Sequence, residues 1–82
     1  MNKKIPVLHN KIRRLRFDHG EITQQKLAEL VQATRQTIVA LEANQYAPSL
    51  VLAFRIARVF GVPVVDVFQY EFDSPKQIAK TT

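Results

Sequence analysis

The chain has 82 residues, no cysteine and a formal net charge of +5, and 46% of its residues are hydrophobic. This length allows one small domain, and the apolar content is too high for a disordered chain. The composition excludes disulfides and thiolate metal sites, and no apolar run approaches the roughly 18–20 residues of a membrane span. We therefore expect a cytoplasmic protein without a membrane partner. Its positive charge favours a polyanionic partner, although it also suits a surface that is only well solvated.

Residues 1–8, MNKKIPVL, show no helical period and include a proline. We expect a basic arm whose Lys3 and Lys4 can reach phosphates or a minor groove. Two alternatives remain open at this point: a tail without a role, or packing of the apolar residues of the arm against the core or a second subunit.

A first helix is predicted from about Asn10 to His19. The spacing of Ile12, Leu15 and His19 places them on one buried face, and Phe17 falls outside that face. The sequence offers no account of Phe17 within the core, so it is either covered by a wider core or available as a contact.

Residues 23–46, TQQKLAELVQATRQTIVALEANQY, are predicted to form two short helices joined by a tight turn. Thr23 and Thr34 can each cap a helix by accepting a hydrogen bond from a backbone N–H in its first turn. The predicted buried residues are Leu27, Leu30 and Val31 in the first of these helices and Ile38 and Leu41 in the second. Arg35 and Gln36 remain exposed at the start of the second helix, where side chains can reach base edges in a major groove. This pattern predicts a helix-turn-helix that binds DNA.

A fourth helix is predicted to begin after Ser49 and to run through Phe60. Its predicted apolar stripe consists of Leu50, Ala53, Phe54, Ile56, Ala57 and Phe60. A stripe this broad is typical of a central core helix.

The segment 62–72 is ambiguous. Its β-branched residues favour a strand, whereas the spacing of Val64, Val67 and Phe68 favours a helix. The alternation of Phe68, Tyr70 and Phe72 indicates a short strand, or an extended segment packed on the core. Residues 73–82 are expected to be a polar tail.

The pattern TQQKLAELV-x-x-TRQTIVALE-x-x-x-Y-x-PSL-x-LAFRIARVFGV resembles the short bacterial and archaeal Cro/cI-type regulators, also called the xenobiotic-response-element family. The resemblance covers about residues 10–71 and rests on separately spaced elements, among them T-Q-x-x-L-A, T-R-Q-T-I and F-G-V. It implies an all-α, five-helix DNA-binding domain over residues 9–72, with a short fifth helix near residues 64–68 and room for a short extended segment after it.

The resemblance also implies a function: a sequence-specific transcriptional repressor that binds double-stranded DNA as a dimer on a palindromic operator, with residues 35–43 as the recognition helix. The base-contacting residues that it implies are Arg35, Gln36, Thr37 and Ala40. The phosphate-contacting residues that it implies are Gln24, Thr34, Gln45, Tyr46 and Arg14. In phage members of the family, the positions of Arg16 and Glu42 hold an ion pair between the first and third helices.

No enzyme activity, metal site or cofactor is predicted. The chain has no cysteine, and His9 and His19 have no obvious ligand partners in the sequence. The apolar stripes are expected to form a core and not a cofactor pocket. The alternative function is an antitoxin-like module that binds its own promoter and also contacts a protein partner through its C-terminal segment.

A homodimer is expected because one helix-turn-helix covers only one half-site. The predicted dimer contact consists of Val64, Phe68, Tyr70 and Phe72. Residues 68–72 can also pair with their own copy as an antiparallel strand. The alternative is that these aromatic residues fold back over the core of the same chain.

Overall fold

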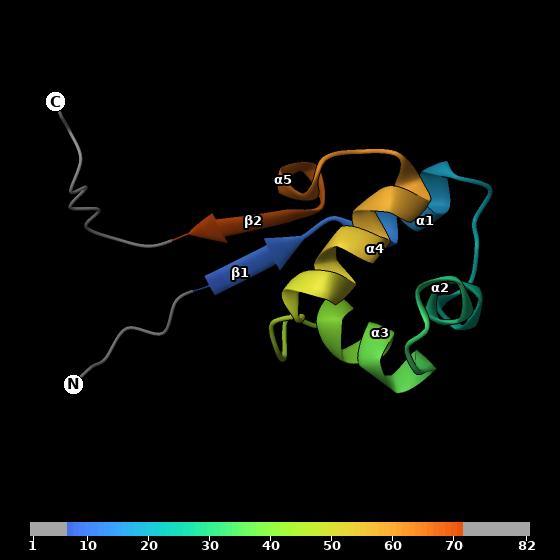
Figure 1. Ribbon diagram of the computed structural model, residues 1–82, viewed down its shortest axis with the longest axis horizontal. Coiled ribbons are helices and arrows are strands. Elements are labelled where there is room, and N and C mark those ends of the chain that lie inside the picture. The colour runs from blue at the N-terminus through green and yellow to red at the C-terminus, as the bar shows by residue number, and fades with distance from the viewer. Residues whose placement is uncertain (1–6, 72–82) are drawn as a thin grey trace, which may run out of the picture.

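The computed structural model describes residues 7–71, which form five helices and a two-stranded sheet that extends from one side of the helices (Figure 1). In chain order the elements are β1 (Val7–Asn10), α1 (Ile12–Asp18), α2 (Gln24–Val31), α3 (Arg35–Glu42), α4 (Leu50–Phe60), α5 (Val64–Val67) and β2 (Phe68–Glu71). The predicted five-helix domain is therefore confirmed, and its short extended segment is β2.

Hydroxyl side chains cap the N-terminal ends of α2, α3 and α4. Each hydroxyl accepts a hydrogen bond from the backbone N–H three residues later, at 2.9 Å in α2 and 3.1 Å in α3 and α4. The capping residues are Thr23, Thr34 and Ser49. A cap of this kind stabilises a helix by about 1 kcal/mol relative to alanine, so three of the helix starts are set by local chemistry.

Helix α1 is shorter than predicted, because it begins at Ile12 and Asn10 belongs to β1. The side chain of Asn10 bridges two elements. Its Oδ1 accepts a hydrogen bond from the N–H of Ile12 at 3.1 Å, and its Nδ2 donates to the carbonyl of Leu41 at 2.7 Å. Asn10 thereby joins the start of α1 to the last turn of α3.

Strand β1 pairs antiparallel with β2, with Val7 opposite Glu71 and Asn10 opposite Phe68. The pairing continues towards the helices, where the N–H of Lys11 donates to the carbonyl of Val67 at 2.9 Å. Residues 7 and 8, which were expected to belong to the arm, lie in β1, and Leu8 packs against the core, as one of the alternatives for the arm allowed. The partner strand, β2, lies at the other end of the described chain, so the sequence pattern around β1 cannot predict the pairing. Lys3 and Lys4 lie outside the described residues.

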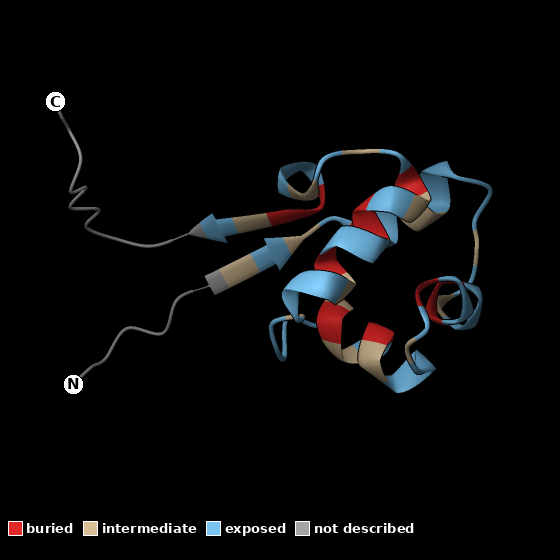
Figure 2. Ribbon diagram, viewed as in Figure 1, coloured by how far each residue is buried: buried red, intermediate tan, exposed pale blue. Residues whose placement is uncertain are grey.

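The core lies between α4 and the other elements, and its buried side chains come from every helix (Figure 2). Its members are Ile12, Leu27, Ala28, Val31, Ile38, Leu41, Ala53, Ile56, Ala57, Phe60, Val67 and Phe68. The predicted burial of Leu30, Leu50 and Phe54 is wrong, since all three are exposed. Helical spacing places them next to buried neighbours, but the width of a buried stripe depends on which elements cover the helix.

Candidate nucleic-acid interface

Helices α2 and α3 are joined by a short turn that begins at Gln32. This residue adopts the left-handed conformation, with φ of +62°, and the N–H of Ala33 donates to the carbonyl of Ala28 at 2.9 Å. Beyond the turn, Ile38 and Leu41 point from α3 into the core. The inner side of α3 is therefore fixed, while the side that faces away from the core is free to meet another molecule.

The outer side of α3 combines polar and apolar groups. Arg35, Gln36 and Val39 are exposed, and Ala40 is half-buried beside them. In a major groove, an arginine fork suits guanine, a glutamine amide suits adenine, and apolar groups suit the methyl of thymine. This surface can therefore distinguish base pairs by their edges.

Thr37 differs from the other predicted base-contacting residues. It is half-buried, and its hydroxyl lies 2.9 Å from the hydroxyl of Thr34 at the helix cap. Val39 was not among the predicted base contacts, but its expected place near the exposed side of α3 agrees with the structure, where it is exposed with Arg35. A residue four positions after Arg35 lies on the same side of a helix.

An open depression of about 590 Å³ lies where α1, the start of α2, and α3 meet. Its lining consists of Arg13, Arg16, Thr23, Gln24, Gln25, Arg35 and Glu42. Arg13 and Arg35 are exposed there, so the depression offers two cations and the amide of Gln24 next to the exposed side of α3. A phosphate group that flanks a recognised base pair matches these groups in charge and in hydrogen bonding.

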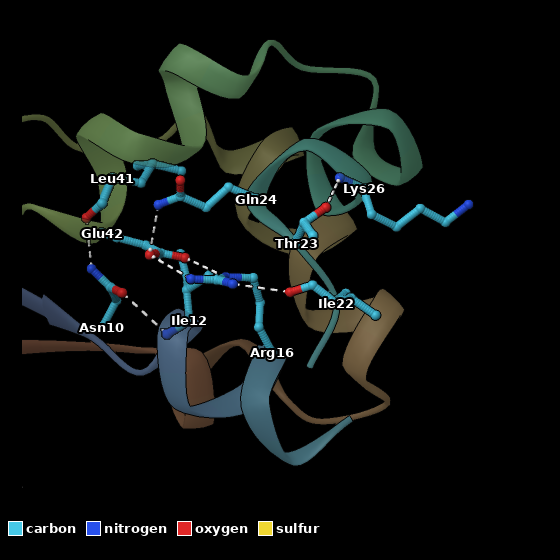
Figure 3. Close-up of polar contacts among 9 residues, drawn as sticks. All are labelled: Asn10, Ile12, Arg16, Ile22, Thr23, Gln24, Lys26, Leu41 and Glu42. Carbon is cyan, nitrogen blue, oxygen red and sulfur yellow. Dashed lines mark hydrogen bonds and ion pairs between the residues drawn. The ribbon is translucent and has the colours of Figure 1, made fainter. Parts of the chain in front are cut away.

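An ion pair forms the inner wall of this depression (Figure 3). Arg16 Nε lies 2.7 Å from Glu42 Oε2, and Arg16 Nη2 donates to Glu42 Oε1 at 3.0 Å. Arg16 Nη1 also donates to the carbonyl of Ile22 at 2.9 Å. The side chains of Arg16 and Glu42 are only 16% and 10% exposed, so this pair is shielded from solvent, unlike a surface pair of little energetic value.

The amide of Gln24 takes part in the same network. Its Nε2 donates to Glu42 Oε1 at 3.1 Å, so this carboxylate oxygen accepts hydrogen bonds from both Gln24 and Arg16. The carboxylate of Glu42 therefore connects α1, α2 and α3 at one point (Figure 3).

Three further residues predicted to contact phosphates are exposed around α3: Thr34 before it, and Gln45 and Tyr46 after it. The chain turns at Asn44, which adopts the left-handed conformation with φ of +58°. The N–H of Gln45 then donates to the carbonyl of Ala40 at 2.9 Å, which holds this loop against the end of the helix.

Arg14, the fifth predicted phosphate contact, lies apart from Gln24. Its Nε is 3.2 Å from a carboxylate oxygen of Asp18, and it lines a different depression together with Phe17. Arg13, which borders both depressions, is the exposed arginine of α1 that lines the one with Gln24, beside the ion-paired Arg16. The position of Arg13 could have been predicted from the sequence. It precedes Arg16 by three residues and therefore lies near Arg16 on the surface of the helix.

The part of the chain between residues 7 and 71 contains no cluster of three or more potential metal-ligating side chains. None of its helices is long and apolar enough to cross a membrane.

A helix pair with this turn and an exposed second helix defines the class of helix-turn-helix domains. Residues 12–67 match the helix-turn-helix family, and the chain belongs to its Cro/cI-type members. The chain is 47% identical over 66 residues to a protein of Methanocaldococcus jannaschii, covering 80% of this chain and 98% of that protein. It is 44% identical over 64 residues to a Bacillus subtilis protein, covering 78% of this chain and 96% of the relative. Both relatives are named as uncharacterised HTH-type transcriptional regulators.

Proposed function

We propose that this chain is a sequence-specific, double-stranded DNA-binding transcriptional regulator that acts as a repressor. The observation that carries the proposal is the outer side of α3, where Arg35, Gln36 and Val39 are exposed while Ile38 and Leu41 hold the other side in the core. The names of the relatives support a role in transcription.

In this proposal the N-terminal half of α3 enters the major groove. Arg35 binds a guanine and Gln36 an adenine, and each bidentate contact contributes about 1–3 kcal/mol of discrimination against the wrong base. Val39 and Ala40 contact thymine methyl groups. Thr37 supports the helix cap and lies at the edge of the base-reading surface.

The flanking residues fix the position of the protein on the duplex through phosphates. Gln24 and Arg13 bind one phosphate from the depression beside α3, and the loop after α3 binds another through Gln45 and Tyr46. Thr34 adds a hydroxyl at the start of the helix. These contacts carry no sequence information, so they contribute to specific and non-specific binding alike.

A second copy is required to read a palindrome. The predicted dimer contact needs revision, because Phe68 is buried in the core of its own chain and Val64 is half-buried. Tyr70 is exposed, and Phe72 lies outside the described residues. One edge of β2 is also occupied by β1, which leaves only its other edge for pairing with a second copy.

The contact that we propose instead is the outer side of α4 together with α5. Leu50 and Phe54 are 70% and 58% exposed, and Val65 is 71% exposed. Phe54 also borders a shallow groove that continues to Pro63 and Val64. Such a surface can be self-complementary, because across a two-fold axis the apolar side chain of each copy can pack into the groove of the other.

The function is tested by selecting bound sequences from random duplex DNA at about 0.15 M salt. The expected product is an inverted repeat whose half-sites lie about one DNA turn apart, at roughly 10–10.5 base pairs. Placing this sequence within a promoter should then lower transcription in vitro when the protein is added. A selection without any enriched sequence contradicts the proposal. Enrichment of isolated half-sites alone supports base reading and contradicts the dimer.

A further inference from the structure

We propose that Glu42 is a positioning residue for DNA binding. Its carboxylate fixes the side-chain amide of Gln24 so that one N–H of the amide is directed at a DNA phosphate. Arg16 neutralises the carboxylate that does this. The inference deepens the proposed function and rests on it, since it assigns a role in DNA binding to an ion pair that otherwise serves only the fold.

The first step concerns the orientation of the amide. An ionised carboxylate only accepts hydrogen bonds, so the nitrogen of Gln24, and not its oxygen, must face Glu42. The 3.1 Å contact from Gln24 Nε2 to Glu42 Oε1 uses one of the two N–H groups of that nitrogen. The second N–H belongs to the same nitrogen and stays available on the side of the depression. A flipped amide would bring its carbonyl towards Glu42, and two acceptors would then face each other.

The second step concerns charge. A carboxylate in the wall of a phosphate site would repel the phosphate, because both groups are negative. Here Arg16 binds Glu42 through two hydrogen bonds, at 2.7 and 3.0 Å, in a setting with little solvent. The pair is neutral as a unit, so Glu42 can orient Gln24 without opposing the anion. The cations left to meet the phosphate are Arg13 and Arg35.

The third step concerns the relation between the two parts of the interface. Gln24 is the first residue of α2, and Glu42 is the last residue of α3. The residue that holds the phosphate-binding amide therefore belongs to the helix that reads the bases. The hydrogen bond between Gln24 and Glu42 fixes the phosphate-binding amide relative to the recognition helix α3 before DNA binds. Less conformational entropy is then lost on binding, which strengthens the binding.

The neighbouring glutamine supplies a control within the same depression. Gln25 Nε2 donates to Glu29 Oε2 at 3.1 Å, and this bond stays within α2. Gln25 therefore has the same side chain and lines the same depression, but it has no hydrogen bond to α3. Replacing Glu42 should change the contribution of Gln24 to DNA binding and leave that of Gln25 unchanged.

The test uses the full chain and a single half-site duplex. The ion pair is removed as a unit by the double change Arg16→Met and Glu42→Met, because an apolar pair can replace a buried ion pair without loss of stability. Gln24→Ala and Gln25→Ala are each made in the wild type and in this Met/Met variant. Thermal unfolding followed by circular dichroism shows that each variant is folded at the temperature of the binding assay.

We expect Gln24→Ala to weaken binding to all sequences by about tenfold, as for a lost hydrogen bond to a charged group. The Met/Met change should weaken binding by a similar factor, and adding Gln24→Ala to it should cause no further loss. Gln25→Ala should have the same effect in both backgrounds. The salt dependence should stay unchanged in all these variants, because no cation that meets a phosphate has been removed.

Two results would overturn the inference while leaving the proposed function intact. One is full additivity of Gln24→Ala and the Met/Met change. The other is a salt slope that flattens by about 0.9 in the Met/Met variant, which would mean that Arg16 itself contacts a phosphate. Failure of the wild type to bind any duplex would instead contradict the proposed function.

A measurement on the unaltered protein covers the case in which the Met/Met variant does not fold. In nuclear magnetic resonance, the side-chain amide of Gln24 should be more restricted in its motion than that of the exposed Gln36. On addition of duplex DNA, one of its two amide protons should shift more than the other. A Gln24 amide as mobile as that of Gln36 in the free protein would refute the positioning role.

Discussion

Helices α3 and α4 each have one buried side and one exposed side, but the side chains on their exposed sides differ in chemistry. Each turns one side into the core and leaves the other exposed. The exposed side of α3 carries Arg35 and Gln36, whose hydrogen bonds have fixed directions, whereas that of α4 carries Leu50 and Phe54. Directional groups suit the edges of bases, and apolar groups suit another apolar protein surface. The comparison indicates that burial identifies which surfaces are free, and that side-chain chemistry identifies what each of them can bind.

The largest effect is expected from removing the directional groups of α3. The double change Arg35→Ala and Gln36→Ala should reduce discrimination by about 2–6 kcal/mol per half-site, the sum of two bidentate contacts. Stability should change by less than about 0.5 kcal/mol because both side chains are exposed. Competition between the selected sequence and random DNA measures the loss. Unchanged preference in this variant would show that α3 does not read the bases.

Changing the exposed surface of α4 should separate assembly from base reading. The double change Leu50→Ser and Phe54→Ser should give a monomer in analytical ultracentrifugation and abolish cooperative binding to a palindrome. Binding to one half-site should keep its sequence preference. Leu30→Ser is the control for the loss of an exposed leucine, because Leu30 is exposed on α2 and belongs to neither α4 nor α5. A variant that remains dimeric places the contact elsewhere.

Val39 gives a finer test, because it is the exposed apolar residue of α3 and is proposed to contact a thymine methyl group. Val39→Ala should lower the preference for thymine at one base pair per half-site by about 1 kcal/mol, as expected for lost contact with a methyl group. Replacing that thymine with uracil in the duplex removes the methyl group of the base, which is the other partner in the same contact. If Val39 meets the methyl, the uracil substitution should cost little in the variant and more in the wild type.

The smallest effect is expected for Arg13 and Arg14, the two exposed arginines of α1. Arg13→Gln should flatten the salt dependence of binding by about 0.9, whereas Arg14→Gln should leave it nearly unchanged. The reason is that Arg13 lines the depression with Gln24, while Arg14 is paired with Asp18 and lies apart from it. Equal slopes for the two variants would mean that the depression beside α3 does not hold a phosphate.

Features that depend on near neighbours in the chain could be predicted from the sequence. The caps at Thr23, Thr34 and Ser49 are local, and so is the left-handed turn at Asn44. The pattern of the helix pair also identified the exposed position of Arg35 and Gln36. The family resemblance resolved the first part of the ambiguous segment as α5, and the alternation from Phe68 onwards indicated the extended segment that is β2.

Features that depend on distant partners could not be predicted. Leu50 and Ala53 differ in burial because α4 is covered on one side only, and its sequence does not say which elements cover it. Strand β1 forms because Leu8 and its neighbours meet β2 from the other end of the chain. The bond from Gln24 to Glu42 likewise requires α1, α2 and α3 to be in place together.

The pairing of β1 with β2 also determines how the domain responds to force. Val7 and Glu71 lie opposite each other at the end of the sheet farthest from the helices, so a pull on both ends of the domain acts across the strands. An antiparallel pair loaded in this way opens one hydrogen-bonded step at a time, and a two-stranded sheet has little stability of its own. At Asn10 the opening meets added resistance, because the 2.7 Å hydrogen bond to the carbonyl of Leu41 ties the strand to α3. The free end of the sheet can thus yield under tension before the arrangement of α2 and α3 changes.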